Sequence, residues 1–214
     1  MAIYVYPNGV ETPVKNMYIG EYIPEIYEEY TFLNWAAEQT WWTVQSGSFT
    51  TWSQWSNWIT AWKWSTNCTM YRDISTWTQF KLQHRCRVNP ASRGWWMWCK
   101  VYDSSDANKY AWFRYALTTS SGYAGYNMGV IDGVNWTTWQ IISTSLSQWF
   151  YIDEIVYDGT DCTINLYQDD NGTPWTLIYT YTAVWTNTTD RLSLYHEHAT
   201  TPYSQTNRIK IWHI

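Results

Sequence analysis

The stretch from Gln148 to Trp185, QWFYIDEIVYDGTDCTINLYQDDNGTPWTLIYTYTAVW, contains three runs rich in Ile, Val, Tyr, Thr and Trp. The dipeptides Asp158-Gly159 and Asn171-Gly172 separate these runs, and both suit two-residue hairpin loops because their residues tolerate positive φ. The middle run, which begins at Asp161, alternates apolar and polar residues, and this is the period of a strand with one buried face. The stretch therefore predicts an antiparallel β-meander.

The rest of the chain adds strand-like runs bounded by turns. In FKLQHRCRV, alternate positions place Phe80, Leu82, His84, Cys86 and Val88 on one face. The tryptophans between Trp52 and Trp64 are also spaced like a helix face, but Thr, Ser and Asn fill the gaps and helix formers are scarce, which favours strand and loop. About nine to twelve strands with almost no helix signal predict an all-β antiparallel sandwich or jelly roll.

Composition limits the partners of the chain. The net charge is −5 without a basic cluster, which argues against nucleic acid. No apolar run of about 18 residues occurs, so nothing is expected to insert into a membrane. Charged residues make up 14% and aromatic residues 20%, with 19 Trp and 19 Tyr. One sandwich core cannot hold so many rings, so some are expected at a groove, a subunit contact or a partner site.

The order of the later segments resembles a known superfamily. A W-x-x-x-x-G-x-F phrase precedes FKLQHRCRV and WWMWCKVYDSSDANKYAWFRYAL, and a strand–DG–strand–NG element leads to RLSLYHEH and NRIKIWHI. This order is similar to the concanavalin A-like lectin and glucanase fold, near its laminin-G-like and pentraxin-like branches, over residues 35–214. The resemblance implies two curved antiparallel sheets with a concave face that often holds the ligand site.

The first 30 residues differ in character from the rest of the chain and contain short runs interrupted by Pro and Gly. The phrase VKNMYIGEYIPEIYEEY resembles N-terminal segments of phage and virus tail or fibre proteins. We therefore expect an N-terminal anchoring or docking segment at 1–30 and a sandwich domain at 31–214. The alternative is an ordinary strand pair packed on its own domain.

The glucanase branch of this superfamily carries E-x-D-x-x-E on one strand, which aims two carboxylates at one glycosidic bond. Here Tyr151 takes the first position, and the adjacent Asp153 and Glu154 point to opposite faces of a regular strand. We interpret the pair as a solvent-facing charged strand edge, and we expect no catalytic residues and no enzyme.

The metal-binding residue types do not converge in sequence. Cys68, Cys86, Cys99 and Cys162 lack zinc-type spacing, so no metal site is predicted. Cys86 and Cys99 flank a turn symmetrically and allow a cross-strand disulfide, although reduced buried thiols are favoured. His196 and His198 alternate on a predicted strand without a third ligand, so we interpret them as solvent-facing. The oxygen-rich loops 103–106 and 169–172 make Ca²⁺ conceivable, but plain turns fit them better, and no cofactor is predicted.

The remaining functional signal is an aromatic surface. In KYAWFRYAL, alternation puts Tyr110, Trp112 and Arg114 on the outer face and their neighbours in the core. Sugar rings stack on Trp and Tyr while their hydroxyls take polar partners, so these residues form a candidate carbohydrate site together with Trp136 and Trp139. The alternative is packing beneath loops or against another subunit.

These observations predict a non-enzymatic structural protein of a virus particle, such as a fibre, spike or head decoration, that displays a lectin-like sandwich. The N-terminal sequence lacks the features of a signal peptide, which fits synthesis in the host cytoplasm and a place on the virion surface. The expected partners are further copies of the chain, other virion proteins through residues 1–30, and glycans. A stand-alone extracellular lectin module is the main alternative, and a glycoside hydrolase is a weaker one.

Overall fold

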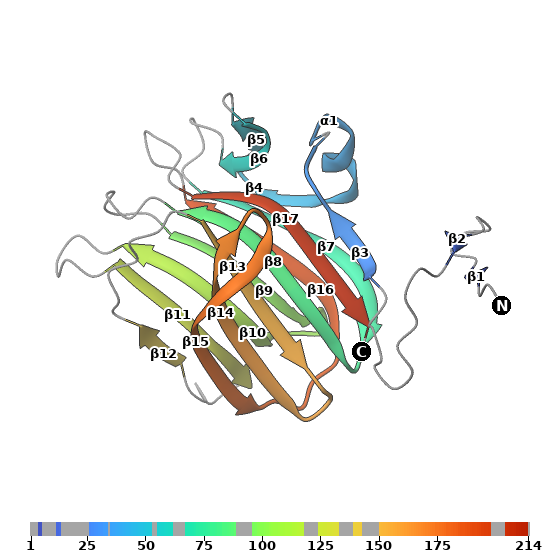
Figure 1. Ribbon diagram of the computed structural model, residues 1–214, viewed down its shortest axis with the longest axis vertical. Coiled ribbons are helices and arrows are strands. Elements are labelled where there is room, and N and C mark those ends of the chain that lie inside the picture. Colours follow the sequence, from blue (N-terminus) through green and yellow to red (C-terminus); the bar gives the residue numbers. More distant parts are fainter. Residues whose placement is uncertain are drawn as a thin grey trace.

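Two antiparallel sheets stack face to face in the computed structural model (Figure 1). The structure describes residues 4–5, 12–13, 26–33, 35–52, 55–61, 67–88, 96–117, 124–132, 139–142, 150–197 and 204–213. Only short helical turns interrupt the strands among these residues. The predicted all-β antiparallel sandwich is confirmed.

One sheet, here the β10 sheet, has seven strands in the order β12-β11-β10-β9-β16-β7-β4. These strands are β12 (Trp139–Ile142), β11 (Ala124–Asp132), β10 (Asp106–Leu117), β9 (Trp96–Asp103), β16 (Thr189–Glu197), β7 (Asn67–Trp77) and β4 (Thr43–Ser46).

The other sheet, here the β13 sheet, has eight strands in the order β15-β14-β13-β8-β17-β6-β5, and β3 also pairs with β17. These strands are β15 (Thr173–Val184), β14 (Asp161–Asp170), β13 (Phe150–Tyr157), β8 (Phe80–Val88), β17 (Ser204–His213), β6 (Trp55–Ala61), β5 (Phe49–Trp52) and β3 (Ile26–Tyr30).

The predicted meander is present as β13, β14 and β15. Asp170 pairs with Thr173 across a two-residue loop in which Asn171 and Gly172 have φ of 48° and 93°, as an Asn-Gly hairpin requires. The first turn differs from the prediction, because Tyr157 pairs with Cys162 and four residues lie between them. In that turn the Asp158 carboxylate accepts hydrogen bonds from the backbone N–H groups of residues 160 and 161.

The core lies between the two sheets and is built from alternate strand positions. On β14 the predicted inward residues Cys162, Ile164 and Leu166 are fully buried. Phe80 and Leu82 on β8 are buried in the same core cluster. The predicted alternation of both runs is confirmed, and large rings complete the cluster, including Trp35, Trp42 and Trp185.

In the described part of the tryptophan-rich region, which includes residues 55–61, strands are present rather than a helix, since β5 and β6 pair with each other. The short helical turns α1 (Trp35–Glu38) and η2 (Gln39–Trp41) were not predicted. The buried Trp35 indole N–H donates to the backbone oxygen of Phe49 at 3.2 Å. This long-range contact holds α1 against β5, and no local sequence signal encodes it.

The N-terminal segment forms a two-stranded ladder of β1 (Tyr4–Val5) and β2 (Thr12–Pro13). Its last residues belong to the sandwich, because β3 pairs with β17 from Ile26 to Tyr30. A docking role for 1–30 stays a prediction. Within the described residues, no helix has the length and apolar character needed to span a membrane.

The four cysteines are free and buried. Cys86 lies on β8 and Cys99 on β9, and these strands belong to different sheets. The predicted placement of both residues on one hairpin is therefore wrong, because the chain crosses from one sheet to the other between them.

Candidate functional site

The side chains of β10 alternate between the core and the outer face of the β10 sheet, as predicted. Ala111 and Phe113 are fully buried in the core cluster, and Tyr110, Trp112 and Arg114 occupy the intervening positions. The guanidinium carbon of Arg114 lies 5.1 Å from the centroid of the Trp112 ring. Tyr110 meets the same ring edge-on at 6.1 Å. The structure thus brings together three of the predicted sugar-binding residues, although Trp112 is only 7% exposed.

The ammonium group of Lys100 lies among the aromatic rings of this face. Lys100 on β9 pairs with Trp112 in the strand register, and its ammonium lies 4.6 Å from the Tyr102 ring and 5.0 Å from the Tyr110 ring. Burial lowers the pKa of Lys100, and burial likewise raises the pKa of Tyr110. The electron-rich ring faces offset part of the cost of burying the ammonium.

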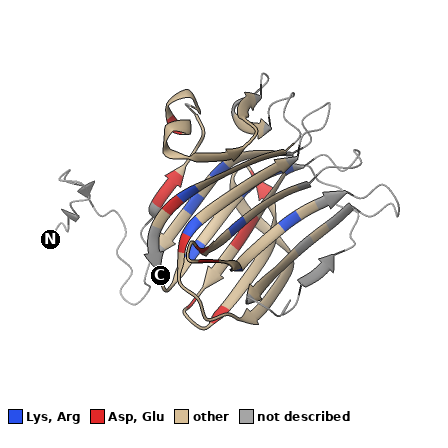
Figure 2. Cartoon of the chain, turned by 180° about the vertical axis from the view of Figure 1, so that it is seen from behind, with Lys and Arg blue, Asp and Glu red and all other residues tan. Residues whose placement is uncertain are grey.

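Other rings on the β10 sheet pair with each other. Trp98 and Tyr195 stack at 3.8 Å with an interplanar angle of 8°. Arg191 lies 4.2 Å above the Tyr71 ring. Figure 2 shows that the basic residues are spread singly over several strands. On this sheet, cations and neighbouring rings already occupy many aromatic faces.

The other two predicted sugar-binding residues are less well placed by the structure. The backbone of Trp139 lies on β12, where it pairs with Gly129 of β11. Trp136 lies outside the described residues. Their part in a sugar platform stays a prediction.

The outer face of the β13 sheet carries a carboxylate that the sequence did not assign to a site. Glu154 is 5% exposed, and one of its oxygens, Oε2, contacts Lys81 Nζ at 3.0 Å and accepts from Gln83 Nε2 at 2.7 Å. Its other oxygen, Oε1, accepts from Asn165 Nδ2 at 3.1 Å and from the Tyr167 hydroxyl at 3.4 Å. Burial and the nearby Glu154 carboxylate raise the pKa of Tyr167. The arrangement is an ordered array of hydrogen-bonding side chains on the two strands that flank β13.

The tip of the β14–β15 hairpin bends over this face (Figure 1). Asp169 Oδ2 accepts from Arg85 of β8 at 2.9 and 2.8 Å, and its Oδ1 accepts from the backbone N–H of Gly172 at 2.5 Å. Arg208 of β17 donates to the backbone oxygen of Gly172. Because β8 and β17 lie two and three strands away from β14, these contacts fold the tip across the sheet.

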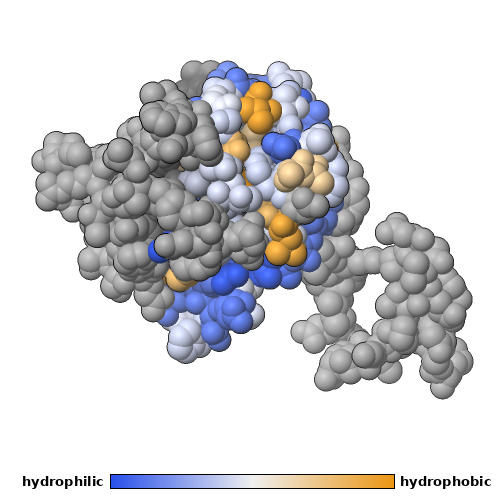
Figure 3. Space-filling view, turned by 90° about the horizontal axis from the view of Figure 1, so that it is seen from above, coloured by the Kyte–Doolittle hydropathy of each residue, from blue (hydrophilic) through white to orange (hydrophobic). Residues whose placement is uncertain are grey.

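Aromatic rings lie near two basic side chains of this face. The Trp212 ring lies 5.4 Å from Lys81 Nζ, and the Trp58 ring lies 5.5 Å from the Arg85 guanidinium. Trp175, which comes after the hairpin tip on β15, is 70% exposed. Elsewhere exposed apolar side chains are dispersed, and Figure 3 shows separate apolar spots among polar surface at the upper end of the molecule.

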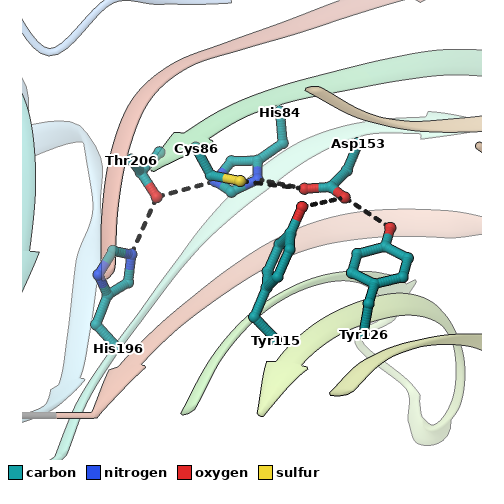
Figure 4. A network of polar contacts seen from close by, with 7 residues as sticks. All are labelled: His84, Cys86, Tyr115, Tyr126, Asp153, His196 and Thr206. Carbon is teal, nitrogen blue, oxygen red and sulfur yellow. Dashed lines mark hydrogen bonds and ion pairs between the residues drawn. The ribbon is translucent and has the colours of Figure 1, made fainter. Parts of the chain in front are cut away.

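A second carboxylate lies inside the sandwich, one residue away on β13 (Figure 4). Asp153 is fully buried, and its Oδ1 accepts from the hydroxyls of Tyr115 at 2.9 Å and Tyr126 at 2.6 Å. Its Oδ2 lies 3.3 Å from His84 Nδ1 and accepts from Cys86 Sγ at 3.5 Å. Two of these partners come from the β10 sheet and two from the β13 sheet, so the carboxylate joins both layers. Burial and the Asp153 charge raise the pKa of both tyrosines and of the Cys86 thiol well above their usual ranges.

The network continues through a bridging hydroxyl. Thr206 Oγ1 lies 2.9 Å from His84 Nε2 and 3.0 Å from His196 Nε2. Asp153, His84 and Thr206 thus have the acid–imidazole–hydroxyl order of a hydrolytic triad. All three side chains are fully buried, so no substrate reaches them in this fold.

The structure corrects two interpretations of charged residues. Asp153 and Glu154 do point to opposite faces, which confirms that they cannot flank one bond. They are no solvent-facing edge, however, because β13 lies between β14 and β8 and both side chains are buried. His196 does not face solvent either, since it is fully buried beside Thr206. His198 lies outside the described residues.

The two oxygen-rich loops use their carboxylates for internal contacts. Asp103 accepts from Ser105 and from Thr188 at 2.7 Å, and these hydrogen bonds lower its pKa. Asp169 pairs with Arg85 at 2.8 Å. Binding of Ca²⁺ at either loop would require these contacts to be exchanged.

Sequence reasoning missed the interior network, although one signal for it was present. His84 and Cys86 occupy inward positions of β8 between apolar residues, and a buried polar side chain needs a partner. The partner positions on β13, β10 and β17 are far away in sequence, and only the strand register brings them together.

No protein-family model matches the sequence, and no curated protein is similar enough to match it. Solved structures do match. The CBM2 module of the evolved Dit of Lactobacillus casei BL23 phage J-1 has a TM-score of 0.64 and 12% identity, covering 87% of this chain and 94% of that chain. The legume lectin-like domain from Entamoeba histolytica has a TM-score of 0.58 and 11% identity, covering 82% of this chain and 91% of that chain.

A third similar structure is the exoplasmic/lumenal domain of VIP36 in its Ca²⁺- and mannose-bound form. Its TM-score is 0.58 at 10% identity, and the match covers 81% of this chain and 83% of that chain. At such identities the similarity is one of fold. The structure therefore confirms what the order of the segments predicted: this chain has the concanavalin A-like, legume-lectin-like jelly-roll fold.

Proposed function

We propose that this chain is a non-enzymatic, carbohydrate-binding protein of a virus particle. The observation that carries the proposal is the match in fold over 87% of the chain to a module of a phage Dit protein. The exoplasmic/lumenal domain of VIP36, crystallised in a Ca²⁺- and mannose-bound form, shares the fold. The resemblance of the N-terminal phrase to fibre proteins adds support for a place on the virion surface. A stand-alone extracellular lectin is the alternative.

The non-enzymatic part of the proposal is supported by the carboxylates. Hydrolysis of a glycosidic bond needs two carboxyl groups that face the same bond. On the outer face of the β13 sheet, Glu154 contacts Lys81 and Asp169 contacts Arg85. Each of these two carboxylates therefore already contacts a basic side chain of its own.

We place the glycan on the outer face of the β13 sheet, beneath the β14–β15 hairpin tip. Gln83, Asn165 and Tyr167 supply hydrogen-bonding groups whose positions are fixed by Glu154, and Trp175 supplies an exposed ring on β15 of the same sheet. Sugar sites combine a few fixed polar groups with aromatic surface in this way. The residues predicted from sequence, Tyr110, Trp112 and Arg114, are proposed as a second contact surface on the other sheet.

A glycan array probed with the full chain tests this function. Trp175→Ala is expected to abolish the binding of hits without loss of stability, because the side chain is exposed. Trp41→Ala is the matched control, since Trp41 is 54% exposed but lies on η2. Loss of binding in Arg114→Ala instead would move the glycan to the β10 sheet. An array without hits for the folded chain would contradict carbohydrate binding.

The virion role has a separate test. Native mass measurement of the full chain is expected to give a homo-oligomer, and deletion of residues 1–25, which leaves β3 paired with β17, is expected to give a monomer. A full-length chain that is monomeric would favour the stand-alone lectin. Turnover of a β-glucan that disappears in Glu154→Gln would instead establish a hydrolase.

A further inference from the structure

The interior network contains three side chains of metal-ligating type. Among the residues that the structure describes, one ligand atom each of His84, Cys86 and Asp153 lie within 4.8 Å of one another, and all three side chains are fully buried. His84 and Cys86 occupy alternate positions of β8 and therefore share its inward face. The β13–β8 register places Asp153 directly opposite His84. The strand pairing thus builds the cluster.

The distances between the donor atoms fit a tetrahedral ion. Asp153 Oδ2 lies 3.3 Å from His84 Nδ1 and 3.5 Å from Cys86 Sγ. Bond lengths of about 2.0–2.1 Å to nitrogen and oxygen and about 2.3 Å to sulfur imply donor separations of about 3.3–3.6 Å around tetrahedral zinc. Two of the three donor separations therefore match such an ion, and the third, between His84 Nδ1 and Cys86 Sγ, is no longer than 4.8 Å.

We propose that His84 Nδ1, Cys86 Sγ and Asp153 Oδ2 form a buried structural site for a divalent transition-metal ion of the zinc type. A mixed nitrogen, sulfur and oxygen donor set selects Zn²⁺ or Co²⁺ over Ca²⁺ and Mg²⁺, which take oxygen ligands. The Tyr115 hydroxyl, which donates to Asp153 Oδ1 at 2.9 Å, lies next to the Asp153 carboxylate (Figure 4). The site is independent of the proposed glycan surface.

Charge balance supports this site. Four donors surround Asp153, so it is the ionised, acceptor-only form that fits its surroundings. The ion replaces the thiol proton of Cys86, which leaves to solvent, and the divalent ion, thiolate and carboxylate then sum to zero. Because a net charge in a core is costly, neutralisation of the cluster favours uptake.

The neighbours of the cluster can accept the accompanying change of tautomer. Without an ion, His84 donates through Nδ1 to Asp153 and accepts through Nε2 from the Thr206 hydroxyl, which accepts from His196. With an ion on Nδ1, the His84 proton moves to Nε2 and donates to Thr206, whose hydroxyl turns to donate to His196 Nε2, and the proton of His196 moves from Nε2 to Nδ1. Both directions use the same separations of 2.9 and 3.0 Å. Such partners fix the orientation of a metal-binding imidazole.

Cobalt is the probe that tests the proposal. The full chain is unfolded in urea with a chelator, refolded with Co²⁺ and separated from free ion. We expect one bound cobalt per chain, a thiolate-to-cobalt charge-transfer band, and one sulfur neighbour in X-ray absorption at the cobalt edge. Thr206→Val is expected to weaken binding about 10–100-fold, the usual cost of losing a partner of a ligating histidine.

Two cysteine variants give the matched comparison. Cys86→Ser is expected to lose the charge-transfer band, whereas Cys162→Ser is expected to keep it, because Cys162 is a buried thiol elsewhere in the same core. The absorption-edge measurement on the unmodified chain decides the question if Cys86→Ser fails to fold. Substoichiometric cobalt, cobalt without a sulfur neighbour, or a band that persists in Cys86→Ser would overturn the site.

Discussion

Asp153 and Glu154 are consecutive residues of β13, and both carboxylates are buried, at 0% and 5% exposure. Their partners differ. Asp153 receives hydroxyl, imidazole and thiol groups from both sheets. Glu154 receives an ammonium, two amides and a hydroxyl from the strands on either side of it in its own sheet.

The difference separates a structural carboxylate from one available to a ligand. The partners of Asp153 come from opposite layers, so they tie the two sheets together and lie beyond the reach of solvent. The partners of Glu154 all project from one sheet, so they order a surface without crossing the core. Alternation along one strand is sufficient to divide the two roles.

The largest effect on stability is expected for substitution of the interior carboxylate, Asp153. Asp153→Asn keeps the shape but replaces an acceptor oxygen by an NH2 group that cannot accept from the surrounding donors, and it is expected to lower the free energy of unfolding by about 3–5 kcal/mol, because each buried donor left unpaired costs about 1–3 kcal/mol. Urea unfolding followed by tryptophan fluorescence measures the change. A loss below about 1 kcal/mol would contradict the role of Asp153 as the tie between the sheets.

Alkaline pH tests the interior network through two of its tyrosines. The pKa values of Tyr115 and Tyr126 are raised well above the usual value, first by burial and second by the Asp153 charge. A raised pKa in the folded state gives stability that is complete below the unfolded pKa of about 10 and is lost as the pH rises above it. Above pH 10, each tyrosine is expected to lower the free energy of unfolding by about 1.4 kcal/mol per pH unit.

Denaturant titrations above pH 10 measure this slope. Tyr126→Phe is expected to make the free energy of unfolding fall less steeply with pH, by the contribution of one tyrosine. The substitution also removes a hydrogen bond to Asp153. An unchanged slope in Tyr126→Phe would show that Tyr126 is not kept neutral by the interior network.

The sequence predicted the strands of the fold better than it predicted the surroundings of Asp153 and Glu154. The meander, the alternation of β8, β10 and β14, and the jelly-roll order were all predictable, because strand period and turn residues are local signals. The opposite directions of Asp153 and Glu154 came from the same period. The burial of both did not, since it depends on where β13 lies in the sheet.

The sites themselves depend on pairing between distant strands. Glu154 meets Lys81 because β13 pairs with β8, and the intervening chain visits the other sheet. Asp153 meets Tyr115 and Tyr126 across the core. The fold of the β14–β15 tip over the β13 sheet rests on Arg85 and Arg208. No residue spacing in the sequence predicts these contacts.

A substitution at the β14–β15 hairpin tip is expected to disturb the outer face of the β13 sheet without affecting the interior network. Gly172 has φ of +93°, and a Cβ there would lie 2.9 Å from Arg208 Nη2. Gly172→Ala is expected to cost about 1–2 kcal/mol of stability for the left-handed backbone and to weaken glycan binding by displacing the tip. Thermal unfolding and the array hits measure both effects.

Gly159→Ala is the control for Gly172→Ala. Gly159 has φ of +97° and carries similar backbone strain, but its Cβ would face the Thr78 backbone oxygen at the other end of β14. Its loss of stability is expected to be similar, with glycan binding intact. Equal loss of binding in both variants would contradict a role for the tip in the glycan surface.

The smallest effect is expected at Glu154 itself. Glu154→Gln keeps a side chain of the same shape but removes the attraction to Lys81, whose side chain is 32% exposed, so water screens much of the charge. We expect a loss of about 1 kcal/mol, and a double-mutant cycle with Lys81→Met is expected to give a coupling of about 0.5–1 kcal/mol. Urea unfolding measures both quantities. A loss as large as that of Asp153→Asn would mean that the outer carboxylate is as structural as the inner one, and the division of roles along β13 would then be wrong.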